Sequence, residues 1–335
     1  MTAPPAPGFE LVRLRTLLAS PIEAWFPLRP GDRALVSPGE AVVRGAPLAE
    51  RLRDARTDVV AGPAGSGAEP GTWWVATPGR RKASDRPQRG ELLFRSGGRW
   101  RIGTGEPTEA LEAPFAGIVR EVRAGAGLTL HTPARGLLGA DALGGPSTGR
   151  LQVLTPRDGH VRASEIDVGG AGAILVAGSH IDAEAITRAR AVGVRGIIVS
   201  GLGVKERREV RASERRARAG AHGLPPFAVL VLEGAIGRPI ASSIMALIEA
   251  LEGRTVAIID EPACLVIEDP GIELPQPDAS LVRVTAGPLA GVEGTWAGLA
   301  GPHRFSGGVT LEAGLVRFGE RGPVAVPLGD LERFA

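Results

Sequence analysis

The sequence predicts a mixed, multi-domain protein that is rich in β-strands and carries one α/β domain. Its 335 residues are enough for two or three domains of ordinary size. The chain contains 48 Gly and 28 Pro, more than a fifth of all residues, which suits short strands joined by tight turns. Only between residues 171 and 268 do longer apolar runs alternate with helical patterns, and this change of period predicts the α/β domain.

The composition limits the possible classes of function. With 39 basic and 37 acidic residues the net charge is only +2, so any contact with a polyanion must be local. The single cysteine, Cys264, lies in an apolar run, which predicts a reducing compartment and a buried, unreactive thiol. No apolar run reaches the roughly 18–20 residues of a membrane span, and the first residues lack a signal-peptide pattern. We therefore expect a cytoplasmic protein without a membrane partner.

The first region, residues 9–160, is expected to be a β domain. Glycines at positions 39 and 45 separate short apolar runs and predict two short strands around a turn. Residues 113–122 resume this pattern after an insertion at about residues 52–110. The insertion contains a predicted hairpin that turns at Gly97-Gly98.

Two pieces of this region carry a resemblance to a known fold. Gly39-x-x-Val-x-x-Gly45-x-x-Leu48-Ala49 and Ala113-Pro-x-x-Gly117-x-Val119 resemble the two halves of a biotinyl/lipoyl-type barrel-sandwich hybrid. The order of the halves is that of the C-subunit type of the Rnf complex. Neither hairpin contains a lysine, so the resemblance implies a structural or docking barrel instead of a carrier with a swinging arm.

The insertion also contains Trp73, Trp74 and Trp100 among basic residues. Aromatic side chains interleaved with arginines can stack on nucleic-acid bases. The same tryptophans can instead form the core of a small subdomain, and we favour this second interpretation.

Residues 171–268 predict an α/β domain with a parallel sheet. Apolar runs at 172–177, 195–200, 227–232 and 256–259 are continuous, as in strands that are buried on both faces. Helices are predicted over residues 182–192, 204–219 and 239–251, so the first two strands form a βαβ unit. The pattern is similar to the small swivelling α/β domains of the DRTGG type.

Residues 280–335 predict a small β-barrel. Val282 and Val284 alternate along a strand and are followed by Gly287-Pro-Leu-x-Gly291-x-x-Gly294. This run resembles a KOW motif, the signature of the SH3-like barrels in NusG-type transcription factors. The resemblance implies contact with RNA, ribosomes or RNA polymerase. However, five arginines are balanced by five acidic residues here, so we expect the module to meet protein or to act as a scaffold.

The helix predicted over residues 204–219 is the first candidate site. Residues 205–218 carry seven positive and three negative side chains, a net charge of +4. Arginines bind phosphates well, so the helix can contact RNA, DNA or an acidic protein; alternatively, it is a solvated helix with internal Glu/Arg pairs. The candidate contact residues are Lys205, Arg207, Arg208, Arg211, Arg215, Arg216 and Arg218.

The second candidate site is the carboxyl end of the predicted sheet, where α/β proteins bind ligands. Ser179, His180 and Asp182 follow one strand, and Ser200, Gly201 and Gly203 follow the next. His222 precedes the third strand and completes the set. The competing interpretation is helix capping by Ser179 or Asp182.

The remaining histidines, His160 among them, show no metal-ligand spacing. The sequence therefore predicts no metal site, no cofactor and no catalytic residue.

These observations predict a non-catalytic adaptor that binds RNA or a transcription or translation complex, with protein partners. Two alternatives stay open. One is a small-ligand sensor or enzyme that uses the strand-end pocket, and the other is a structural protein that forms oligomers.

Overall fold

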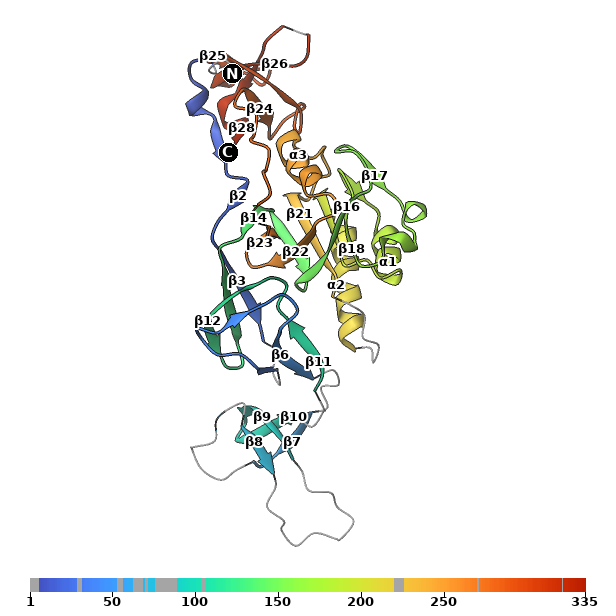
Figure 1. Ribbon diagram of the computed structural model, residues 1–335. Helices are drawn as coiled ribbons and strands as arrows, with labels where there is room; N and C mark the ends of the chain where they lie inside the picture. Colours follow the sequence, from blue (N-terminus) through green and yellow to red (C-terminus); the bar gives the residue numbers. More distant parts are fainter. Residues whose placement is uncertain are drawn as a thin grey trace. The chain divides into compact units, whose positions relative to one another are not determined.

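The computed structural model describes residues 6–28, 32–52, 57–62, 69, 72–75, 89–103, 107–219, 226–269, 271–320 and 322–335 (Figure 1). Strands predominate, and the described residues contain three α-helices. The chain divides into two compact units. The first comprises residues 1–20, 135–211 and 226–335, and the second comprises residues 21–134 and 212–225.

A nine-stranded sheet forms the centre of the first unit. Its order is β15-β21-β20-β18-β16-β22-β23-β14-β2. The four strands from β21 to β16 run parallel, whereas the pairs outside them are antiparallel. The strands are β2 (Leu18–Ala19), β14 (Arg135–Leu138), β15 (Asp141–Gly144), β16 (Ser147–Val153), β18 (Ala173–Val176), β20 (Gly196–Gly201), β21 (Ala228–Gly234), β22 (Thr255–Asp260) and β23 (Ala263–Ile267).

This sheet corrects two expectations. The predicted parallel sheet is in fact mixed, because only its central strands are parallel. The predicted boundary at residue 171 is also wrong for the sheet, since β14, β15 and β16 belong to it. Short strands broken by glycine look alike in sequence whichever sheet they join. The sequence pattern alone therefore places residues 135–153 with the preceding β region.

The helices cover both faces of the sheet (Figure 1). Helices α1 (Ala183–Ala191) and α2 (Val204–Ala219) pack on one face, where Leu175, Ile197 and Val229 point. Helix α3 (Ser242–Ala250) packs on the other face, where Ile174, Ile198 and Leu230 point. Alternate residues of each strand thus enter opposite cores, which explains why the strand sequences are apolar throughout.

Residues 21–134, the larger part of the second unit, are inserted between two neighbouring strands of the first. Ala19 of β2 lies opposite Gly136 of β14 in an antiparallel pair, and residues 21–134 run between them. Two of its sheets have the orders β3-β13-β12-β5 and β11-β6-β4. Their strands are β3 (Ile22–Pro27), β4 (Arg33–Ala34), β5 (Ala41–Val42), β6 (Pro47–Leu52), β11 (Pro107–Glu112), β12 (Gly117–Arg123) and β13 (Gly127–Thr132).

A further sheet lies between β6 and β11 in sequence. It has the order β7-β10-β9-β8 and comprises β7 (Thr57–Val60), β8 (Trp73–Val75), β9 (Arg89–Ser96) and β10 (Arg99–Gly103). Its hairpin turns at Gly97 and Gly98, with φ of 57° and 77°, as the sequence predicted. Trp100 is buried with Val60, Leu92 and Ile102, and Trp74 packs against them, so at least these tryptophans serve as core.

The first unit also contains a six-stranded sheet of order β1-β28-β24-β25-β26-β27. It contains β24 (Leu281–Val284), β25 (Glu293–Arg304), β26 (Thr310–Arg317), β27 (Val324–Pro327) and β28 (Leu331–Phe334). Strand β1 (Arg13–Arg15) pairs in parallel with β28. Residues 9–19 were expected in the β domain that follows them, but they pack here and in the nine-stranded sheet instead.

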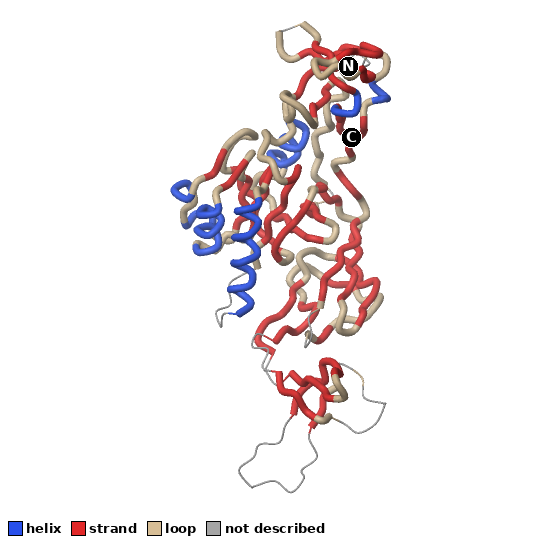
Figure 2. The backbone as a smooth tube through the Cα atoms, turned by 180° about the vertical axis from the view of Figure 1, so that it is seen from behind, coloured by secondary structure: helices blue, strands red, loops and turns tan. Residues whose placement is uncertain are grey.

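Figure 2 shows the α-helices in the region of the nine-stranded sheet, whereas the helical segments near the marked chain ends are short 3-10 turns at Phe9–Leu11 and Leu328–Asp330. Among the residues described, no helix has the length and apolar character needed to cross a bilayer.

Candidate functional site

The carboxyl ends of β18 and β20 are filled by neighbouring chain. A Cβ on Gly201 would lie 2.2 Å from the Ile236 carbonyl oxygen, and one on Gly237 would lie 2.7 Å from that of Ser179. Ser200 is fully buried, and its hydroxyl has no hydrogen-bond partner among the described residues. The segment after β21 therefore covers the sheet end where the sequence predicted a pocket.

The predicted pocket residues have separate roles. The Ser179 hydroxyl donates to the carbonyl oxygens of Asp158 and Gly159 at 3.0 and 2.8 Å, so it anchors a loop. Gly203 directly precedes α2. His222 lies outside the described residues. Among the described members of the set, His180 and Asp182 have side chains that are more than a third exposed.

These two side chains meet a third that the sequence did not predict. Strand β17 (His160–Val161) pairs in parallel with β19 (His180–Ile181), and this register places His160 opposite His180. Val161 and Ile181 point into the core, whereas the two imidazoles lie on the outer face with ring centroids 4.8 Å apart. Asp182 follows His180 by two residues, so it shares that face.

Asp182 joins the two histidines. Its Oδ1 lies 2.9 Å from Nε2 of His160 and 3.9 Å from Nε2 of His180. Asp182 occupies the N-cap position of α1, but within the described structure its side chain makes no capping hydrogen bond. Asp182 is therefore the N-cap residue, as the capping interpretation predicted, but its carboxylate faces the histidines instead of the first-turn amides.

The backbone holds this cluster firmly. The Ser179 amide donates to Gly159 at 2.8 Å, and the Asp182 amide donates to Val161 at 3.2 Å. Gly178 has φ of 65°, and a Cβ there would lie 2.6 Å from the Pro156 carbonyl oxygen. We name His160, His180 and Asp182 the histidine cluster; their side chains are 41%, 35% and 43% exposed.

Helix α2 presents part of its basic surface to solvent. Lys205, Arg208 and Arg211 are exposed. Arg207 forms an ion pair with Asp141 and donates to the Leu202 carbonyl oxygen at 2.9 Å. These contacts turn Arg207 towards the protein, so it is a weaker candidate for a partner contact than its exposed neighbours. The side chains of Arg215, Arg216 and Arg218 lie outside the described part of the helix.

A buried network of charges joins the six-stranded sheet to the α/β core. Arg283, 1% exposed, forms an ion pair with Glu233 at 2.6 Å and donates to the Pro239 carbonyl oxygen at 2.7 Å. Arg15 lies 3.9 Å from Glu233 and 3.7 Å from Glu332. Desolvation raises the pKa of Glu233 and lowers that of Arg283, even though each faces an opposite charge.

A second contact joins the same two parts. Glu293 forms an ion pair with Arg157 at 2.6 Å and accepts from the Ser242 amide at 2.9 Å. Arg238 donates to the Thr285 carbonyl oxygen at 2.8 Å and packs against Gly291. The glycine-containing loop that resembles a KOW motif is therefore occupied, at Gly291, by a contact within the protein.

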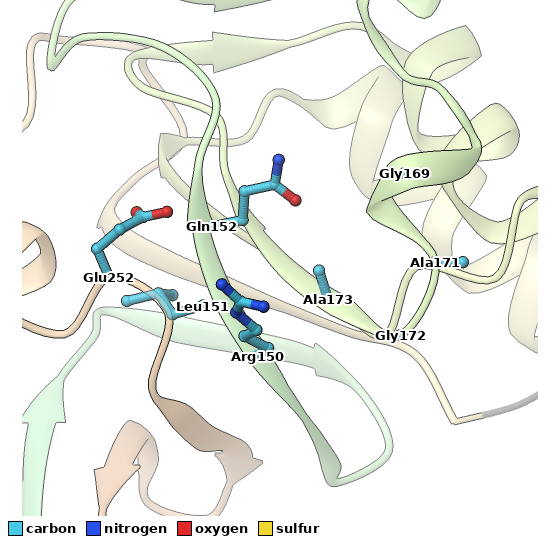
Figure 3. A pocket seen from close by; sticks show the side chains of 8 residues that line it. All are labelled: Arg150, Leu151, Gln152, Gly169, Ala171, Gly172, Ala173 and Glu252. Atoms are coloured by element: carbon cyan, nitrogen blue, oxygen red, sulfur yellow. The ribbon is translucent and has the colours of Figure 1, made fainter.

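One surface pocket of about 380 Å³ lies at the opposite end of the sheet from the predicted one (Figure 3). It borders the start of β18, where Arg150 is paired with Ala173. Glu252 lies at its edge, and its carboxylate accepts from the Val153 amide at 2.8 Å. In Figure 3 the side chains of Arg150, Gln152 and Glu252 do not converge on one point, so this pocket is a weak candidate.

Cys264 is buried, as predicted, and burial raises the pKa of its thiol to about 12. It is therefore no nucleophile.

Comparison with known proteins adds no name to this site. The sequence matches no protein-family description and no curated protein.

Proposed function

We propose that the protein is a non-catalytic adaptor that binds RNA through the exposed basic face of α2. The proposal rests on the positions of the side chains along α2, some of which hold the helix in place while others are exposed. Val210 is buried in the core and Arg207 is tied to Asp141, so both fix the helix in place. Lys205 and Arg208 are exposed and lie three residues apart, and the exposed Arg211 follows after three more residues, although Arg211 also interacts within the protein.

This spacing suits a polyanion. Side chains three residues apart lie on neighbouring turns of one helix face, so the three cations form a stripe. Arginine guanidinium groups bind phosphate oxygens in bidentate fashion, and release of counterions from the nucleic acid favours the complex. Arg215 and Arg218 follow in the sequence at further intervals of four and three residues.

The C-terminal sheet has a supporting part in this proposal. Its resemblance to a KOW module points to RNA machinery, but its charges balance and its glycine loop is packed on Arg238. We therefore assign it to positioning and to contact with protein, and we assign the contact with phosphates to α2.

The enzyme or sensor alternative receives less support. A ligand at the carboxyl ends of β18 and β20 needs space there, and Ser200 is fully buried under the segment that follows β21. Nothing in the described residues favours an oligomer over a monomer.

The test is a titration of fluorescently labelled single-stranded RNA with the protein across a series of salt concentrations. The triple variant Lys205→Gln/Arg208→Gln/Arg211→Gln removes three phosphate contacts. We expect weaker binding and a salt dependence whose logarithmic slope is smaller by about 2, since each contact on a single strand contributes roughly 0.7.

The matched control is Arg13→Gln/Arg120→Gln/Arg254→Gln, which removes the same charge from exposed positions elsewhere. It should keep the wild-type slope. Equal losses in both triple variants would show a non-specific charge effect and reject the proposal, as would the absence of binding at low salt. Binding to DNA alone would reject the choice of RNA.

A further inference from the structure

We propose that the histidine cluster binds one divalent transition-metal ion, with Zn²⁺ as its best-suited occupant. The site is separate from α2 and does not depend on the RNA proposal. It rests on three donors, His160, His180 and Asp182, whose metal-binding atoms all lie within 4.8 Å of one another.

The donor set matches the metal class. Two imidazoles and one carboxylate are typical ligands of Zn²⁺, whereas Mg²⁺ and Ca²⁺ prefer oxygen ligands alone. Zinc–ligand bonds of about 2.0–2.2 Å in a tetrahedron place the donor atoms about 3.3 Å apart. The observed separations of 2.9 and 3.9 Å from Asp182 bracket this value, so small rotations of the side chains suffice.

The backbone supplies the pre-organisation that such a site needs. Parallel pairing of β17 with β19 fixes the spacing of the two histidines before any ion binds. The Asp182 carboxylate faces His160 although it occupies an N-cap position, where its usual partner is a backbone amide. A metal ion would take the place of the hydrogen bond between Nε2 of His160 and Oδ1 of Asp182.

The cluster also leaves room for a further ligand. All three side chains are more than a third exposed, so solvent reaches the position that the protein does not fill. Three protein ligands with an open fourth position are the arrangement of zinc sites that take up water or an anion. The alternative is a surface His–Asp hydrogen bond with a second histidine beside it.

The experiment uses the full chain without an affinity tag, freed of metal by a chelator that is then removed. Zn²⁺ is titrated in by calorimetry, and Co²⁺ is added separately to record its visible absorption bands. We expect one equivalent of Zn²⁺ to bind with a Kd in the micromolar range or below, and Co²⁺ bands typical of few-coordinate nitrogen and oxygen ligation. Mg²⁺ should bind far more weakly.

The variants His160→Ala, His180→Ala and Asp182→Asn should each weaken Zn²⁺ binding at least tenfold. The control His303→Ala removes an exposed histidine elsewhere and should change nothing. Thermal melting without metal shows whether each variant is folded, and three independent variants protect the test against the failure of one. No Zn²⁺ binding by the wild type, or equal affinity in all four variants, would overturn the proposal.

Discussion

Arg283 shows how a single residue can cost free energy and still be required. Its guanidinium is almost completely buried and faces Glu233. Burial nevertheless lowers the pKa of Arg283 and raises the pKa of Glu233, so it disfavours the charged form of each group. This opposition to both charged forms is the usual penalty of a buried ion pair. We therefore expect the pair to contribute more to how the six-stranded sheet meets the α/β core than to the stability of the protein.

We therefore expect the single variant Arg283→Met to lower the free energy of unfolding by about 3–5 kcal/mol, because it leaves Glu233 buried without its close partner. The double variant Arg283→Met/Glu233→Leu should regain most of this loss, since Arg15 and Glu332 still pair. Urea unfolding followed by circular dichroism measures both.

Arg254→Met is the control for that pair of variants. It breaks an exposed ion pair with Asp269 and should cost less than about 1 kcal/mol. A double variant as unstable as the single one would contradict this expectation. It would show that the ion pair between Arg283 and Glu233 is itself stabilising, beyond the cost of leaving Glu233 without a partner.

The contact of His160 with His180 and Asp182 is a feature that the sequence did not predict. His180-Ile-Asp182 has the spacing of two side chains on one face of a strand, and this local signal was available. His160 lies twenty positions earlier, and only the pairing of β17 with β19 brings it to His180. Such pairing depends on the path of the intervening chain, so spacing in the sequence did not reveal it.

At the scale of elements, local patterns predicted the α/β region well. The helix predicted over residues 204–219 has those bounds in the structure, and the strands at 172–177 and 195–200 differ from β18 and β20 by one residue at each end. Continuous apolar runs of β-branched residues and helical periodicity are local properties. Strand order is not local, and the antiparallel additions at both sides of the sheet went unrecognised for that reason.

Gly201 illustrates a contact between elements that only glycine allows. We expect Gly201→Ala to destabilise the protein by about 1–3 kcal/mol, because the new methyl group would collide with the backbone of Ile236 and Gly237. Thermal unfolding followed by circular dichroism measures the effect.

Gly145→Ala is the matched control. A Cβ at Gly145 would meet nothing within 4 Å, so this change should stay within about 0.5 kcal/mol of the wild type. If Gly201→Ala is equally harmless, the segment after β21 does not pack on the end of β20 as described.

At the scale of the whole molecule, the chain is built as an insertion within an insertion. Residues 21–134 interrupt the pair β2–β14. Within them, the sheet formed by β7 to β10 interrupts the pair β6–β11. In each case the flanking strands pair antiparallel, so the insertion occupies the place of a hairpin loop. A change of composition predicted the inner insertion. The outer insertion was not predicted, because short strands broken by glycine lie on both sides of its boundaries.

This architecture predicts that the first unit folds without the second. Replacing residues 20–135 by Asn-Gly joins Ala19 directly to Gly136, which already face each other, through a turn that suits a two-residue hairpin. The shortened protein should remain soluble and unfold cooperatively in calorimetry. Replacing only residues 53–106 in the same way is the milder comparison, and a molten or insoluble product from both would contradict the nested arrangement.

The pairing of β1 with β28 has a consequence for how the protein is made. The Val12 carbonyl oxygen accepts from Arg333, which is 321 positions further along the chain. At about 5–20 residues per second, the ribosome needs roughly 15–65 s to bring the second partner out after the first. During that interval Phe9 and Val12, both buried in the finished protein, have no sheet to cover them. A chain whose translation stops before β28 therefore leaves the apolar side chains of Phe9 and Val12 exposed, and a chaperone or protease can bind there.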